Sequence, residues 1–127
     1  MGEGELSIED IEGTNFARID VTDGGNAPYS VQLIQYLPVL RGYRYRVTFD
    51  AFADSPRDIQ MKINGDEEQE WRTYSGLESP SLDTDVQTYE YFFEMSDESD
   101  PEARFELNVG METGTVWIGN PRIEILD

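Results

Sequence analysis

Acidic side chains are the only groups in this sequence with the chemistry for hydrolytic catalysis. The 127 residues include 27 aspartates and glutamates but no histidine and no cysteine, which excludes imidazole bases, thiol nucleophiles and zinc sites built from those ligands. A carboxylate pair across a cleft could still hydrolyse a glycosidic bond. However, no acidic residue stands in an apolar stretch that would raise its pKa and mark a general acid. We therefore expect a protein that is not an enzyme.

A second group of polar residues has the chemistry for recognising sugars rather than transforming them. In two stretches that alternate with period two, one face carries amide and charged side chains, which offer planar donors and acceptors to sugar hydroxyls. On the pattern alone, an ordinary solvated sheet face is the better interpretation. The residues on this face are Gln60, Lys62, Arg104, Glu106 and Asn108.

Two aromatic sites shift the balance toward sugar binding. Trp71 and Tyr74 lie in a polar stretch without an obvious core partner, and Tyr29 follows Pro28 and precedes a stretch that contains Gln32. Aromatic rings stack on the apolar faces of pyranose rings, while neighbouring amides bind the hydroxyl groups. Either ring of the polar stretch could instead close the end of a folded domain. The combination of these rings with the polar face favours binding.

The elements that must position these residues are β-strands. Period-two alternation recurs along the chain and no window has a helical stripe, which predicts an all-β fold. Clusters of Asp, Gly, Asn, Ser and Pro between the alternating stretches are typical of turns. About eight strands at this spacing indicate one antiparallel β-sandwich or jelly roll over residues 1–127. The predicted strands cover residues 16–21, 29–35, 43–53, 58–64, 87–95, 103–109, 115–118 and 122–126.

The charge of the chain narrows the choice of partners. The formal net charge is −18, and Lys62 is the only lysine among nine basic residues. A field of this sign repels phosphate backbones and anionic lipid. We therefore expect neither nucleic acid nor a membrane as a partner, and no stretch is apolar enough for a transmembrane helix.

Several segments, in order and in register over nearly the whole chain, carry a resemblance to a known family. They are Pro28–Leu33, Gly42–Ala51, Pro56–Gln60, Trp71–Ser75, Ala103–Gly110 and Val116–Asn120. Together they resemble the carbohydrate-binding modules of the family 4 and 9 type, which are galactose-binding-like jelly-roll sandwiches. The resemblance implies an extended glycan in a cleft on the concave sheet, between two aromatic walls and above polar residues.

The same resemblance implies a role for each candidate residue. Tyr29 and Trp71 match the walls, with Tyr74 close by. The floor residues implied by the family pattern are Gln32, Gln60, Arg104 and Asn108, and alternation alone adds Lys62 and Glu106 to this face.

The implied function is non-catalytic binding of a β-glucan or xylan chain by an extracellular domain, secreted as part of a larger glycoside hydrolase that it holds near its substrate. The alternative is a structural or protein-docking sandwich without a sugar site. Burial of Tyr29 and Trp71 in the core would favour this alternative, whereas exposure across one groove would oppose it. We expect a monomer, with a domain-swapped dimer as the alternative.

The chain departs from the family pattern at two places. The usual Asn-Gly-Asp-Phe-like first strand is missing before Glu5, so residues 4–11, or the same segment of a second copy, are predicted to cover that sheet edge. Gly119, followed by Asn120, replaces an aspartate of the family's structural calcium site. We therefore expect no cofactor, and calcium held elsewhere by the acidic surface is the open alternative.

Overall fold

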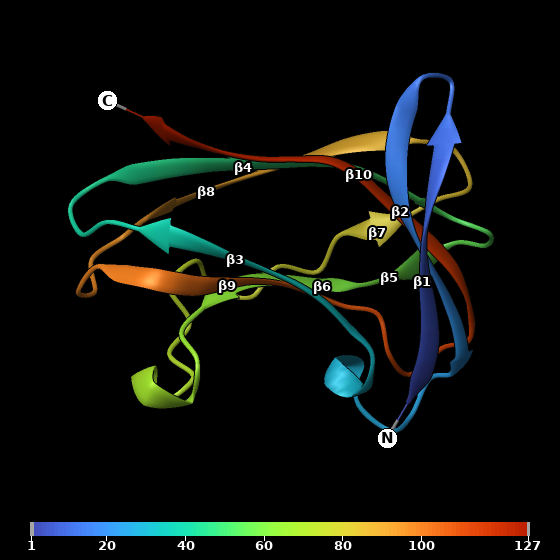
Figure 1. Ribbon diagram of the computed structural model, residues 1–127, viewed down its shortest axis with the longest axis horizontal. Helices are drawn as coiled ribbons and strands as arrows, with labels where there is room; N and C mark the ends of the chain where they lie inside the picture. Colours follow the sequence, from blue (N-terminus) through green and yellow to red (C-terminus); the bar gives the residue numbers. More distant parts are fainter. Residues whose placement is uncertain (1, 127) are drawn as a thin grey trace.

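The structure is a computed structural model that describes residues 2–126. Two antiparallel sheets face each other (Figure 1), as the all-β sandwich prediction requires. The five-stranded sheet contains, in spatial order, β1 (Glu3–Ile11), β2 (Thr14–Asp23), β10 (Gly114–Leu126), β4 (Arg44–Ala53) and β8 (Gln87–Glu94). The three-stranded sheet contains β3 (Gln32–Val39), β9 (Asp100–Asn108) and β6 (Gln60–Asn64), and a small third sheet pairs β5 (Arg57–Asp58) with β7 (Ser81–Leu82).

The core lies between the two large sheets, where alternation buries every second residue. In β4 the inward side chains from Tyr45 to Ala53 are all buried, and Met61 and Ile63 of β6 meet them from the opposite sheet. Each fully buried large apolar side chain contributes about 1.5–3 kcal/mol to folding. This burial fixes which face of β6 and β9 points outward, and so where the polar side chains of those strands lie.

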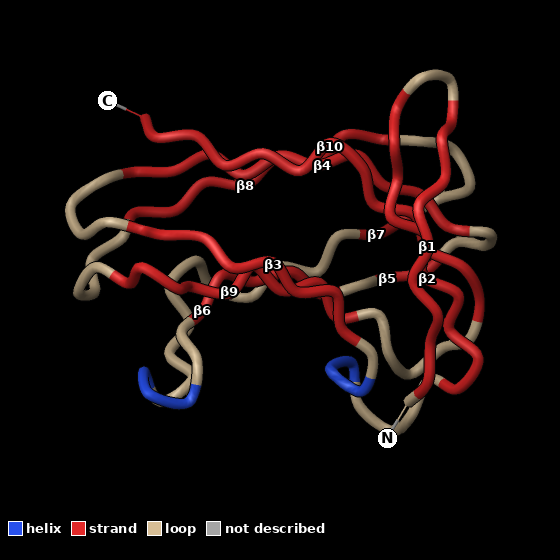
Figure 2. Tube along the Cα trace, viewed as in Figure 1, coloured by secondary structure: helices blue, strands red, loops and turns tan. Residues whose placement is uncertain are grey.

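Two short 3-10 turns lie outside the sandwich. They are η1 (Pro28–Ser30) and η2 (Glu67–Gln69). Figure 2 shows both on the outer side of the three-stranded sheet, away from the core. No helix within residues 2–126 is long and apolar enough to cross a membrane.

Three local expectations were wrong. Tyr29 lies in η1 and not in a strand, because β3 begins only at Gln32. Tyr43, the first residue of the strand predicted over residues 43–53, lies outside β4, which starts at Arg44 after a turn at Gly42, and Tyr43 is 46% exposed. The two predicted strands at the C-terminal end form one strand, β10, whose pairing with β4 shifts register between Gly119 and Arg122.

The N-terminal segment covers the edge of β2 within the same chain. Strands β1 and β2 form a hairpin in which Leu6 pairs with Ile19 and Ile8 with Ala17. Glu12 and Gly13 make the turn with positive φ angles, and glycine adopts such angles at no steric cost. The structure therefore contains the intramolecular pairing that sequence proximity predicted.

Candidate functional site

The outer face of the three-stranded sheet is a regular lattice of mostly polar side chains. Directly paired residues of antiparallel strands point to the same face, so the register of β3, β9 and β6 defines three rows across the strands. The first row is Gln32–Asn108–Gln60, the second is Ile34–Glu106–Lys62, and the third is Tyr36–Arg104–Asn64.

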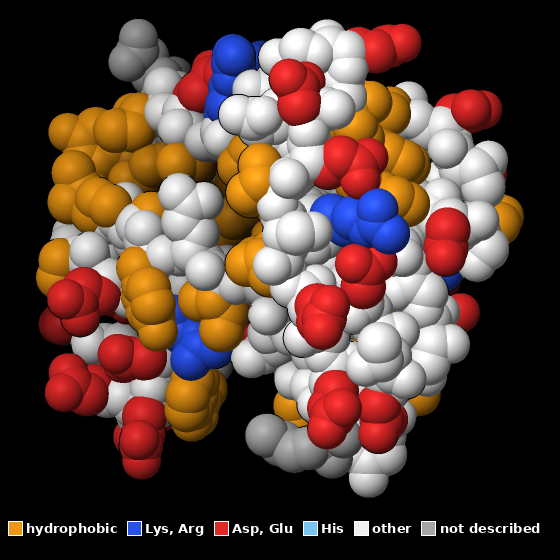
Figure 3. Space-filling view, turned by 45° about the vertical axis from the view of Figure 1, so that its right-hand side comes forward, with side chains coloured by type: hydrophobic (Ala, Val, Ile, Leu, Met, Phe, Trp, Pro, Cys, Tyr) orange, Lys and Arg blue, Asp and Glu red, His pale blue; other side chains and the backbone are white. Residues whose placement is uncertain are grey.

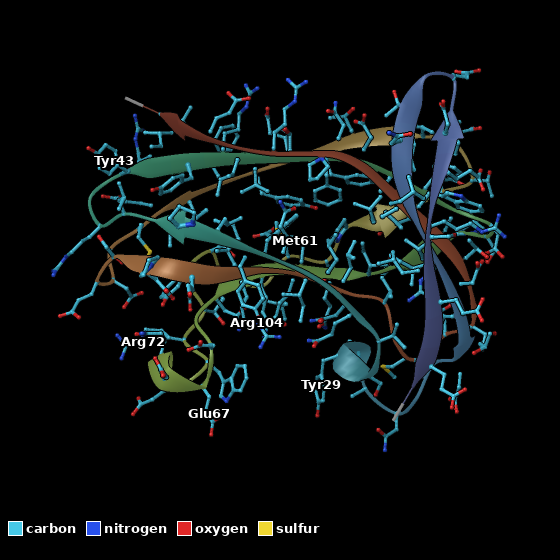
Figure 4. The ribbon with its side chains drawn as sticks, viewed as in Figure 1. Tyr29, Tyr43, Met61, Glu67, Arg72 and Arg104 are labelled. Atoms are coloured by element: carbon cyan, nitrogen blue, oxygen red, sulfur yellow. The ribbon has the colours of Figure 1, made fainter. Side chains whose placement is uncertain are left out.

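Loops on either side of this lattice enclose a groove of about 610 Å³. Figure 4 shows Arg104 pointing away from the sandwich between Tyr29 on one side and the η2 loop, marked by Glu67 and Arg72, on the other. The groove brings together most of the residues selected from the sequence. Its lining is Tyr29, Gln32, Lys62, Asn64, Trp71, Arg104 and Glu106.

The two aromatic walls are exposed rather than buried in the core. Tyr29 is 67% exposed and Trp71 is 52% exposed, and both line the same groove. This is the arrangement that opposes the alternative of a sandwich without a sugar site. The rings present apolar surface to solvent across a polar floor, which is the geometry needed to hold a pyranose ring by its faces.

An unusual backbone conformation holds Trp71 in this position. Glu70 and Trp71 both have left-handed φ angles, 57° and 56°, a conformation that costs about 1–3 kcal/mol for a residue with a side chain. The Trp71 amide donates a hydrogen bond of 3.0 Å to the carbonyl of Asp66, and the Asp66 carboxylate caps η2 by accepting from the Glu68 amide. The hydrogen bonds of this loop therefore hold Trp71 at the groove despite the conformational cost of its left-handed backbone.

Arg104 links the floor of the groove to the Trp71 wall. Its guanidinium carbon lies 5.1 Å from the centroid of the Trp71 ring, within the range of a cation–π contact. Its Nε atom lies 3.2 Å from Oε2 of Glu106, and both side chains are almost fully buried. The Gln32 amide donates bonds of 2.9 Å to Glu106 and to Asn108. This network fixes the floor before any ligand arrives.

Among the described residues, Lys62 and Asn64 each present a polar group to the groove that has no hydrogen-bond or ion-pair partner. Lys62 makes no ion pair there, and the side-chain oxygen of the buried Asn64 accepts no hydrogen bond. Asn64 was not among the site residues predicted from the sequence, although the alternation of Gln60 and Lys62 extends to it. An unpaired donor and an unpaired acceptor in one groove are suited to a ligand that offers both, as a sugar hydroxyl does.

Three predicted site residues do not line the groove itself. Gln60 and Asn108 lie in the first row of the polar lattice and line a neighbouring hollow. Tyr74 packs against the core, and its hydroxyl donates a bond of 2.8 Å to Asp100. Burial and this hydrogen bond raise the pKa of Tyr74. The structure thus places Trp71 in the groove and Tyr74 beneath the same loop.

Comparison with known proteins identifies the family of this chain. A family model described as a carbohydrate binding domain, CBM_4_9, matches residues 2–115. The chain belongs to this family. No curated protein matches the sequence, whereas 35 solved chains match the structure.

Solved relatives of this carbohydrate-binding domain share its fold at low sequence identity. A structure titled "CBM4 structure and function" is 23% identical with a TM-score of 0.85, and the match covers 97% of this chain and 78% of that one. The N-terminal cellulose-binding domain of Cellulomonas fimi β-1,4-glucanase C is 14% identical with a TM-score of 0.71, covering 96% and 89%. A CBM22-1 xylan-binding domain from Paenibacillus barcinonensis is 7% identical with a TM-score of 0.67, covering 100% and 85%.

Membership of this family makes the chain a non-catalytic binding domain, and the chemistry of its groove agrees. Glu106 is the only carboxylate that lines the groove among the described residues, and it is engaged by Arg104 and Gln32. Glycoside hydrolysis needs two carboxyl groups, one on each side of the scissile bond. Elsewhere, Figure 3 shows acidic side chains scattered over the surface with few lysines or arginines among them.

Gly119 of this carbohydrate-binding domain stands where the family pattern implies a calcium-binding aspartate. A Cβ atom at Gly119 would lie 2.7 Å from the ring of Phe16, so a calcium-binding aspartate would not fit there without displacing that ring. Within residues 2–126, no three acidic side chains gather into a candidate metal site. Absence of a cofactor stays a prediction.

Proposed function

We propose that this domain binds one extended polysaccharide chain of the β-glucan or xylan type in the groove between Tyr29 and Trp71. The observation that carries the proposal is the pair of exposed rings on opposite sides of a polar floor. Rings on both sides grip the apolar faces of pyranose units, and the floor binds their hydroxyl groups. Among structures of the same fold, one is named cellulose-binding and another xylan-binding, which supports these two polymers as first choices.

The charge distribution favours a neutral polymer. The loop that carries Trp71 contains four acidic residues just before it, and the formal net charge of the whole chain is −18. The four residues are Asp66, Glu67, Glu68 and Glu70. This field disfavours a polymer with many carboxylates or sulfates. Lys62 and the Asn64 oxygen then bind neutral hydroxyl groups.

The biological role that follows is targeting. A domain that binds a polymer without cleaving it raises the effective concentration of a linked enzyme at that polymer. We infer that the domain works outside the cell as part of a secreted glycoside hydrolase.

Affinity electrophoresis on soluble β-glucans and xylan, followed by calorimetry, tests the groove. Tyr29→Ala and Trp71→Ala should each lower affinity by about 1–3 kcal/mol, which is roughly 5- to 150-fold. Phe92→Ala is a matched control, because this exposed ring lies on β8 of the other sheet.

Two results would reject the proposal. The first is a wild-type protein that binds a glycan of this panel while both wall variants bind it equally well. The second is a wild-type protein that binds none of these polymers. The domain should also release no reducing sugar from any glycan that it binds.

A further inference from the structure

The groove face of β3 carries an exposed aromatic ring that the proposed function does not use. Tyr36 is 60% exposed, and β3 is an edge strand of the three-stranded sheet. Tyr36 pairs directly with Arg104 of β9, so both side chains point to the groove face. An exposed ring beside a largely organised polar floor has no role in the core.

The hydroxyl group of Tyr36 also separates it from three tyrosines that lie in or against the core. The hydroxyls of Tyr45, Tyr74 and Tyr89 each hydrogen-bond to a backbone or carboxylate group. Within the described part of the chain, neither Tyr36 nor Tyr29 makes such a bond. Tyr36 therefore resembles the wall residue Tyr29 in both exposure and free hydroxyl.

The register places the three exposed rings around the middle row of the lattice. Arg104 contacts the Trp71 ring and pairs with Tyr36, so both rings border the third row. Tyr29 precedes Gln32 of the first row by three residues. The middle row, from Lys62 across to Ile34, thus runs between two rings on one side and one ring on the other.

We propose that Tyr36 is a third aromatic contact that extends the groove over the edge of β3. The inference rests on the proposed function and adds the direction and length of the ligand. The polysaccharide crosses the strands from β6 to β3, and adjacent strands lie about 4.8 Å apart. A ligand that stacks on Trp71 must continue past β9 to reach Tyr36, so the site takes a stretch of several sugar units.

Calorimetric titration with a series from disaccharide to hexasaccharide, of β-1,4-glucan and of xylan, tests this extension. Wild-type affinity should rise with length until the ligand spans all three rings. Tyr36→Ala should lower affinity for the longest ligands at least about fivefold and leave the shortest ligand that binds unchanged. Tyr36→Phe keeps the ring and should bind the long ligands nearly as well as wild type, whereas Trp71→Ala should lose affinity at every length.

Two outcomes would overturn the extension while the proposed function stands. In one, Tyr36→Ala binds every length as wild type does. In the other, it loses affinity equally at all lengths, which would mean that Tyr36 supports Arg104 instead of contacting sugar. NMR of the wild-type protein provides a check without substitution, because the Tyr36 ring signals should move with the hexasaccharide and not with the disaccharide. Failure of the wild type to bind any oligosaccharide would instead reject the proposed function itself.

Discussion

On the outer face of the five-stranded sheet, the rings of Trp117 and Phe52 stack with centroids 4.5 Å apart and an interplanar angle of 4°. Arg18 lies 5.5 Å over the Trp117 ring, and Phe16 meets Phe52 edge to face. Charged groups on this face are also paired, as Arg46 is with Glu90 and Glu124. These three rings form an aromatic cluster in which each ring contacts another ring.

On the outer face of the three-stranded sheet, the rings stand apart. Tyr29 and Tyr36 have no ring partner among the described residues, and the only contact of this kind for Trp71 is with Arg104. Both faces are rich in aromatic residues, so aromatic content does not locate the site. Several unpartnered rings that border one polar groove mark a binding site, because their surfaces gain from covering a ligand, whereas a single exposed ring such as Phe92 does not.

The strongest test of this contrast compares Trp117→Ala with Trp71→Ala, because the first should lower stability and the second should lower glycan affinity. Trp117→Ala should lower the free energy of unfolding by about 3 kcal/mol, because it empties the space between Phe52 and Arg18, and should leave glycan affinity unchanged. Trp71→Ala should lower affinity and change stability by less than about 1 kcal/mol. Urea denaturation and affinity electrophoresis measure the two effects, and the reverse assignment would refute the contrast.

Deleting residues 2–11 tests the edge of the five-stranded sheet. Without β1, the backbone N–H and C=O groups of β2 that pair with it are exposed, and proteins normally cover such an edge. We expect the melting temperature to fall by at least about 5 °C, which corresponds to roughly 1–2 kcal/mol. An unchanged melting temperature in a protein that stays monomeric by light scattering would show that β1 protects nothing.

Tyr74→Phe tests whether Tyr74 has a structural role, in contrast to the binding role proposed for Trp71 in the same loop. Asp100 is buried and would lose the hydroxyl donor, which should cost about 1–2 kcal/mol of stability without changing glycan affinity. Because the pKa of Tyr74 is raised, its neutral hydroxyl stabilises the fold below about pH 10, and this stabilisation falls as the unfolded chain ionises at higher pH. The variant should show a smaller alkaline fall, because burial also raises the pKa of Tyr89 and of Tyr91, which both remain. A glycan-binding defect in the variant would place Tyr74 in the site after all.

Added salt should raise the melting temperature slightly. The ion pairs of the five-stranded face are solvent-exposed, so screening them costs little, whereas repulsion within a net charge of −18 is screened over about 10 Å at 0.1 M salt. A gain near 1 kcal/mol would appear as roughly 4 °C. A melting temperature that falls as sodium chloride is added would show that the paired charges outweigh the repulsion.

Calcium should have the smallest effect. Since Phe16 occupies the space beside Gly119, calcium should shift the melting temperature no more than sodium chloride of equal ionic strength does. A larger shift, reversed by a chelator, would reveal a calcium site formed by other acidic residues.

Alternation along a single strand was enough to predict the two faces of the groove sheet. Met61 and Phe105 point into the core while Lys62 and Glu106 point out, because period two depends only on residues close in sequence. The same rule failed at Tyr43, which was predicted to begin a strand. The backbone turns at Gly42, and β4 starts only at Arg44. Strand ends depend on turns that the pattern of side chains does not fix.

The sequence by itself therefore determined the fold class, the family and the polar floor, since these rest on local alternation and on motifs kept in order. Only the tertiary structure decided that Asn64 joins the groove, that Tyr36 borders Arg104, and that Trp71 faces the groove while Tyr74 lies under the loop. The first two depend on the register between β3, β9 and β6, which pairs residues far apart in the chain. The last depends on left-handed backbone angles at Glu70 and Trp71, which residues with side chains adopt only where surrounding contacts outweigh the strain.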